Sequence, residues 1–194
     1  MAKAIFWLTL FHLAFFRKFY FQNPYCYATS EALDTAFPSS HVLGQALRTG
    51  RLVEDDCYYP CYRSLPFLSS FYPPHCLQAM LGAFLPIDAR WVLFSLTSVL
   101  HFLWSSIGAW LLFSDYPAPW IVFFGAVTFA YMGYSIKQNP SIIYTLAWAP
   151  WLLWAANTHR PVWFGLSMGM GILAGYWPVW IPMIPFGGLY WLIH

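Results

Sequence analysis

Charged side chains are scarce in this sequence. Only 8% of its 194 residues are Asp, Glu, Lys or Arg, whereas 60% are hydrophobic and 22% are aromatic. About a quarter of the residues in an average soluble domain are charged, so this composition excludes an ordinary soluble protein. The abundance of large apolar side chains also excludes an intrinsically disordered chain.

Long basic runs are missing as well. The formal net charge is +2, and the longest run of basic residues is the pair Arg17 and Lys18. Nucleic-acid binding needs a basic stripe that neutralises several phosphates. We therefore expect no nucleic-acid partner.

Charge nearly disappears from the second half of the chain. Of the 16 charged residues, 13 lie in residues 1–90, and the remaining 104 residues contain only Asp115, Lys137 and Arg160. Between them lie four uncharged stretches, namely residues 91–114, 116–136, 138–159 and 161–194. Each is long enough for the ~20 residues that cross a ~30 Å hydrocarbon core. The sequence therefore predicts an all-α, polytopic integral membrane protein whose residues 91–194 form a transmembrane helix bundle.

The number of helices in this bundle depends on its prolines. Residues 161–194 would measure ~50 Å as one helix, which is too long for one upright crossing. We expect a break near residues 176–178 and irregular structure around Pro182 and Pro185. The sequence leaves five and six transmembrane helices open.

The N-terminal residues 1–21 are predicted to be the first transmembrane helix. The apolar run Ala4 to Phe16 is short, and a cleaved signal peptide is the alternative. Such peptides end in a small-x-small site, and the bulky residues at 15–20 do not form one.

Residues 22–90 are predicted to be a large loop with short interfacial helices. One helix begins at a serine cap, Ser39 or Ser40, and stops at Gly50, and a second spans Leu77 to Phe84. The first is amphipathic, so its apolar face fits a membrane interface.

All four cysteines lie in this loop. Cys26, Cys57, Cys61 and Cys76 are disulfide candidates, because an even number of cysteines in one exposed loop is typical of an oxidising compartment. We therefore place the loop outside the cytoplasm and the N-terminus inside, in a multi-pass plasma (inner) membrane protein. Thiol exchange by Cys57 and Cys61, a redox function, is a minor alternative. The cysteine spacing does not suit a metal site, and none is predicted.

His41 lies in the string Pro38-Ser-Ser-His41. This string is similar to one element of the phosphatidic-acid-phosphatase-type lipid phosphatases, in which the resemblance would make His41 a phosphate ligand. The other elements of that family are missing, so a histidine in the first turn of a capped helix is the simpler interpretation.

The loop as a whole resembles another family. Asp34, Gly50, Pro60, Leu65-Pro66 and Tyr72-Pro73-Pro74 follow one another in the order and at the spacing of the first outer loop of bacterial YfhO-like membrane proteins, members of the GT-C glycosyltransferase superfamily. Downstream, Ala147-Trp148-Ala-Pro150 and Ala174-Gly175-Tyr176 continue the resemblance. The family's Trp-Asn-Pro-Tyr is replaced by Asp55-Asp56-Cys57-Tyr58-Tyr59-Pro60.

The resemblance implies transfer of a sugar from a polyprenyl-phosphate donor at the outer face of the membrane, in the cell envelope. Asp34 would be the catalytic residue that deprotonates or orients the acceptor. Arg48, Arg51, Arg63 and His41 would bind the donor phosphate. The cofactor is not determined, and the carboxylates at 55 and 56 leave a divalent cation open.

The resemblance covers only the N-terminal part of such proteins. The expected partners are membrane lipid and the lipid-linked sugar donor, together with a second membrane subunit if missing helices are supplied in trans. A non-catalytic membrane subunit or a truncated remnant that packs against such a partner is therefore the alternative function.

Overall fold

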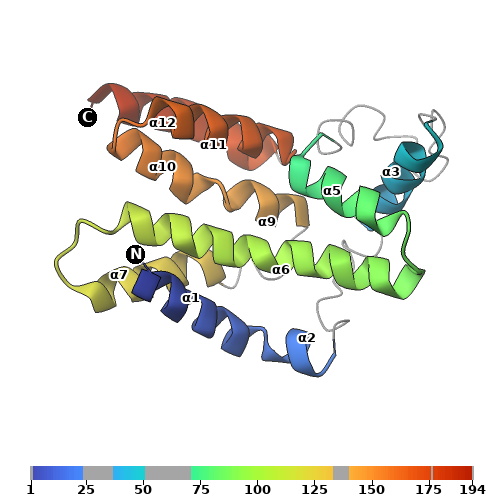
Figure 1. Cartoon of the computed structure of the whole chain (residues 1–194). Helices are drawn as coiled ribbons and strands as arrows, with labels where there is room; N and C mark the ends of the chain where they lie inside the picture. The colour runs from blue at the N-terminus through green and yellow to red at the C-terminus, as the bar shows by residue number, and fades with distance from the viewer. Residues whose placement is uncertain (1, 24–36, 51–70, 133–139, 176, 194) are drawn as a thin grey trace.

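The computed structural model describes residues 2–23, 37–50, 71–132, 140–175 and 177–193. Every regular element in these ranges is an α-helix, and none of them contains a strand. The predicted all-α fold class is therefore confirmed for this part of the chain. Figure 1 shows the longest helix, α6, lying between α1 and α7 on one side and the C-terminal helices on the other.

The N-terminal segment forms α1 (Ala2–Phe15) and α2 (Arg17–Phe21). The predicted single helix is interrupted at Phe16, whose φ of −94° and ψ of 24° are not helical. The backbone N–H of Phe16 still donates to the His12 carbonyl at 2.9 Å, and that of Tyr20 donates to the Phe16 carbonyl at 3.1 Å. The interruption is therefore confined to one residue.

The central helix α6 spans Ile87–Leu112. It begins four residues before the predicted span, directly after Pro86, whose extended backbone ends the preceding turn. Asp88 and Arg90 therefore lie on the helix, with the Asp88 carboxylate in the first turn where the helix dipole favours negative charge. A helix of 26 residues is about 39 Å long.

In the described part of the chain, helices α7, α9 and α10 come next after α6. Helix α7 (Pro119–Tyr131) packs along α6, and α9 (Pro140–Leu146) leads into α10 (Ala149–Asn157). The sequence predicts a membrane helix within the uncharged stretch 138–159, and the structure divides this helix at Ala147 and Trp148. The reason is Pro150, which has no N–H to donate to the Leu146 carbonyl.

The chain ends in α11 (Pro161–Leu173) and α12 (Trp177–Ile193). The predicted break is confirmed, and Gly175 there has a φ of +88°, which glycine adopts without strain. Pro182 and Pro185, which we expected to make the second element irregular, lie inside α12, and the helix runs through both.

Stacked tryptophans join three of these helices. The rings of Trp104 from α6 and Trp151 from α10 stack at a centroid distance of 4.2 Å, and Trp163 from α11 stacks on Trp151 at 5.5 Å. The Trp151 indole N–H donates to the Trp104 carbonyl at 3.0 Å. Gly108 makes room for this ring, because a Cβ at that position would lie 2.6 Å from it.

Helices α3 (Phe37–Thr49) and α5 (Pro73–Gly82) lie together at the end of the molecule where α6 begins (Figure 1). We call it the α3–α5 end. Both helices begin earlier than predicted, α3 at Phe37 and α5 at Pro73, because a proline suits the first turn of a helix. The predicted serine cap is therefore wrong, whereas the predicted stop at Gly50, with a φ of +65°, is confirmed.

The described helices bury polar groups and expose large apolar ones. Eight buried serine, threonine and histidine side chains lie on α1, α6, α9 and α11, namely His12, Ser95, Ser98, His101, Ser105, Ser106, Thr145 and Ser167. Large apolar side chains are exposed on the outer helices, among them Phe6, Trp7, Leu10, Trp120, Phe124, Val162, Ile181 and Leu189. So many exposed large apolar side chains are unusual for a soluble bundle.

One described helix, α6, is long and apolar enough to cross a membrane. Helices α1, α7 and α11 are apolar but shorter. Length and composition allow α6 to cross a membrane, and the predicted multi-pass arrangement stays a prediction.

Candidate functional site

Helix α3 approaches α5 very closely at Gly44. A Cβ added to Gly44 would lie 2.6 Å from the backbone carbonyl oxygen of Ala79, which cannot move without shifting α5. Glycine is therefore required here for the two helix backbones to touch. This contact fixes the polar residues of α3 that lie within one turn of Gly44.

The first of these residues is Ser40. Its Oγ accepts a hydrogen bond of 2.6 Å from the side-chain amide of Gln78 on α5, and both residues are buried. Ser40 was predicted as a helix cap, and instead it pairs two helices. The other amide atom, Gln78 Oε1, has no hydrogen-bond partner although it is buried.

The second residue is His41, which meets Arg90 of α6. Nη1 of Arg90 donates to Nδ1 of His41 at 2.6 Å, and Nε of Arg90 donates to the Leu85 carbonyl at 2.7 Å. An arginine has no acceptor, so His41 Nδ1 must be unprotonated. Burial lowers the pKa of His41 below its usual value of 6.5, and the positive charge of Arg90 lowers it further.

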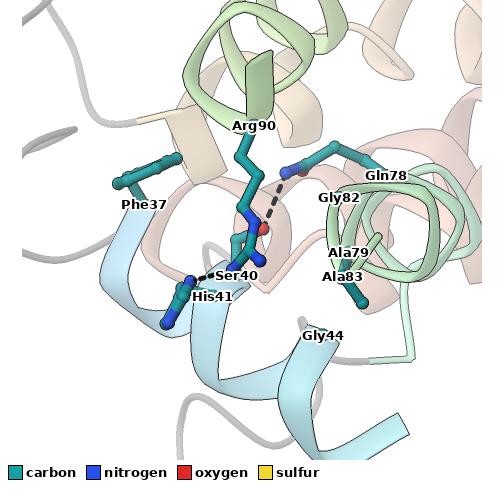
Figure 2. A pocket seen from close by; sticks show the side chains of 9 residues that line it. All are labelled: Phe37, Ser40, His41, Gly44, Gln78, Ala79, Gly82, Ala83 and Arg90. Carbon is teal, nitrogen blue, oxygen red and sulfur yellow. Dashed lines mark hydrogen bonds between the residues drawn. The ribbon is translucent and has the colours of Figure 1, made fainter. Parts of the chain in front are cut away.

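A small pocket lies between α3, α5 and the start of α6. Its lining includes His41, Ser40, Gln78, Arg90 and Phe37, and Figure 2 shows the Arg90 side chain reaching from α6 between the other two helices. Its free volume of about 10 Å³ holds about one water molecule. The pocket can therefore receive one oxygen atom of a larger ligand that sits at its mouth.

A buried hydrogen-bond chain anchors α5 to the bundle. The hydroxyl group of Tyr72, the residue before α5, lies 2.6 Å from Nε2 of His101 on α6. The Trp148 indole N–H donates to the same hydroxyl at 2.9 Å. Burial raises the pKa of Tyr72, so its hydroxyl stays protonated and donates to His101.

Thr97 sets the donor-to-acceptor direction of these hydrogen bonds. Its carbonyl oxygen lies 2.6 Å from Nδ1 of His101 and can only accept, so Nδ1 carries the hydrogen and Nε2 accepts from Tyr72. Beside it, Tyr144 of α9 bonds Ser98 at 3.0 Å and stacks on Tyr72 at a centroid distance of 5.6 Å. Side chains from α6, from α9 and from the residue before α5 therefore form one polar cluster.

A second pocket opens beside this cluster, between α6, α7 and α9. Its volume is about 30 Å³, and its lining is mostly apolar apart from His101 and Ser105. His101 already has a partner at each ring nitrogen. This pocket therefore offers little polar recognition.

The structure describes two of the predicted catalytic and phosphate-binding residues, both on α3. His41 lines the pocket, whereas Arg48, also on α3, is exposed in its last turn. Asp34, Arg51 and Arg63 lie outside the described residues.

The disulfide prediction is untested by the described part of the chain. Cys76 lies half-buried on α5, and the other three candidates, Cys26, Cys57 and Cys61, lie outside the described residues. Within the described ranges no three His, Cys, Asp or Glu residues are placed to hold a metal ion.

Sequence reasoning missed four residues of the site: Gln78, Arg90, Tyr72 and His101. Arg90 carries a usable signal, because it is the last charged residue before the uncharged stretch 91–114. Gln78 and His101 carry no such signal in the sequence, because only the fold brings them to their partners.

Comparison of this chain with protein-family models, with curated proteins and with solved structures finds no match. The resemblance to GT-C glycosyltransferases therefore rests on the loop motifs and the two downstream motifs, and it stays a prediction.

Proposed function

We propose that the chain is a multi-pass membrane protein with its α3–α5 end at one membrane surface. The exposed apolar side chains of α1, α7, α11 and α12 support this proposal, because they suit contact with lipid tails. The buried serines and histidines suit the interior of such a bundle, where polar groups need partners.

We place the α3–α5 end outside the cytoplasm. The four cysteines support this side, because their even number in one loop suits an oxidising compartment. The opposite end contains the turn with Asp115 between α6 and α7 and the turn with Arg160 between α10 and α11 (Figure 1). These turns would then face the cytoplasm.

At the outer surface we propose GT-C-like transfer of a sugar from a polyprenyl-phosphate donor. The donor keeps its isoprenoid tail in the lipid and its phosphate at the interface, so its ligands must lie where a membrane-length helix begins. The observation that carries the proposal is Arg90, which lies near the start of α6 and has no acidic partner among the described residues. In this proposal Asp34 activates the acceptor hydroxyl.

The experiment is a transfer assay with the purified protein in lipid nanodiscs, using a radiolabelled polyprenyl-phosphate sugar. Asp34→Asn keeps the size of the side chain and removes the base, so we expect a loss of at least a hundredfold in transfer rate. Asp115→Asn, at the opposite end, is the matched control and should transfer at the wild-type rate. Equal rates for both variants would remove Asp34 from the mechanism.

A non-catalytic membrane subunit is the second candidate. It is favoured by α11, where a Cβ added to Gly165 or Gly169 would meet no atom within 4 Å. Small residues four apart on an open helix face allow another transmembrane helix to approach closely. A protein that purifies alone in mild detergent and transfers sugar would exclude this candidate.

A further inference from the structure

The charge of Arg90 is not neutralised by any residue that the structure describes. Its two hydrogen-bond partners, His41 Nδ1 and the Leu85 carbonyl oxygen, are uncharged acceptors. No ion pair joins it to Asp88, the carboxylate nearest to it in the sequence of α6. The full positive charge of a half-buried side chain is therefore available to a ligand.

The two partners hold the guanidinium in one orientation. A guanidinium carries five N–H groups in a planar fork. The Leu85 carbonyl accepts from the Nε–H, and His41 accepts from one N–H of Nη1. The remaining N–H groups include both of Nη2, and Arg90 lines the pocket. A fixed fork with free N–H groups is the arrangement that binds a carboxylate or phosphate through two oxygens.

Gln78 provides a second, independent indication of a ligand. It is only 4% exposed, its amide nitrogen is held by Ser40, and its Oε1 has no partner. A buried acceptor without a partner costs about 1–3 kcal/mol, which a ligand hydroxyl would relieve. The same pocket therefore offers a cation to an anion and an acceptor to a hydroxyl group.

We propose that Arg90 and His41, with Gln78, form a binding site for the phosphate ester of a hydroxyl-bearing lipid headgroup. Arg90 contacts the phosphate, His41 positions Arg90, and Gln78 accepts a hydrogen bond from a headgroup hydroxyl. The phosphate sits at the mouth of the pocket, since the interior holds about one oxygen atom. This inference rests on the proposed function in that it names the residues that would hold the phosphate of the sugar donor.

The test measures ligand binding to the full chain in phosphatidylcholine nanodiscs, with polyprenyl phosphate as the probe and uncharged polyprenol as the reference. We expect Arg90→Gln to raise the Kd for polyprenyl phosphate about tenfold and to leave polyprenol binding unchanged. Arg160→Gln is the matched control, because Arg160 is exposed in the turn at the opposite end of the bundle, and it should change the Kd less than twofold. An unchanged Kd in Arg90→Gln would overturn the proposal.

Two further variants separate the roles within the site. Arg90→Lys keeps the charge but loses the fork, so its Kd should lie between those of the wild type and Arg90→Gln. His41→Gln keeps an acceptor for Arg90 and should bind like the wild type, whereas His41→Leu should weaken binding. Equal binding by His41→Gln and His41→Leu would remove the positioning role of His41.

A measurement on the wild-type protein keeps the proposal testable if a variant at Arg90 fails to fold. An anion bound next to His41 stabilises its protonated form, so saturating polyprenyl phosphate should raise the pKa of His41 measured by NMR. Polyprenol should not change it. An unchanged pKa at saturation would contradict the site.

Phosphatidylglycerol and inorganic phosphate distinguish the sources of the phosphate. If Arg90→Gln also raises the Kd for phosphatidylglycerol tenfold, the site is supported and its ligand is bulk anionic lipid. If Arg90→Gln raises the Kd for inorganic phosphate, the ligand is a soluble anion. If the protein binds polyprenyl phosphate through Arg90 but transfers no sugar, this inference stands and the proposed transferase activity is wrong. If Arg90→Gln transfers sugar with the wild-type KM for the donor, the transferase activity stands and this inference is wrong.

Discussion

The hydroxyl group of Tyr72 lies 2.6 Å from Nε2 of His101, and this contact joins the loop that precedes α5 to the middle of α6. Trp148 donates to the same hydroxyl, so one oxygen atom satisfies two buried ring nitrogens. The Tyr72 side chain therefore fastens the start of α5 to the helix bundle, in addition to the Arg90–His41 bond that joins α6 to α3.

Replacement of Tyr72 by Phe should destabilise the protein by about 2–3 kcal/mol. The change removes the hydroxyl and leaves His101 Nε2 and Trp148 Nε1 buried without partners. Denaturation of the purified protein in detergent measures the loss. Tyr116→Phe is the control, since Tyr116 is 60% exposed in the turn after α6, and it should change stability by less than 0.5 kcal/mol.

Two glycines of α11 should respond oppositely to the same substitution. A Cβ at Gly171 would lie 2.2 Å from the ring of Trp180, whereas one at Gly165 would meet nothing within 4 Å. We expect Gly171→Ala to lower the free energy of unfolding by about 1–3 kcal/mol and Gly165→Ala to leave it unchanged or raise it. Equal effects would mean that α11 and α12 do not pack as described.

Acidic pH should weaken the attachment of α3. The pKa of His41 is lowered in the folded protein, so the unfolded chain binds the proton more readily. Stability is therefore fully present above pH 6.5 and falls as the pH drops from there through the lowered pKa, where protonated His41 loses its bond from Arg90. Thermal melts at pH 7.5, 6.5 and 5.5 measure this decline.

His41→Gln is the control for this pH dependence. Glutamine keeps an acceptor for Arg90 and does not titrate, so the variant should lose part of the decline between pH 6.5 and 5.5. A variant with the full wild-type decline would show that another group is responsible.

Much of this fold can be predicted from the sequence, because scarce charges and prolines mark the helix ends. The break before Pro150 and the start of α6 after Pro86 could not be placed from apolar runs. The break depends on the N–H that Pro150 lacks, and the start of α6 depends on the extended backbone of Pro86. Ser40 shows a different failure. Its local sequence favours a cap, and only the tertiary contact with Gln78 explains its place inside α3.

The candidate site was less predictable than the fold. His41 could be singled out from its local motif, but its partner Arg90 lies 49 residues away and is brought to it by the close approach of α3 to α5 at Gly44. A contact of that kind depends on how three helices pack, which no short sequence window contains.

The most direct test of the membrane account is the accessibility of the two ends of the bundle. Single cysteines at Thr49, near the α3–α5 end, and at Tyr116, in the turn between α6 and α7, are introduced after replacement of the four natural cysteines by serine, and a thermal melt checks that this background folds. An impermeant thiol reagent should label Thr49→Cys in intact cells and Tyr116→Cys only after permeabilisation. Labelling of both in intact cells, or of Tyr116→Cys alone, would contradict a bundle that spans the membrane with its α3–α5 end outside.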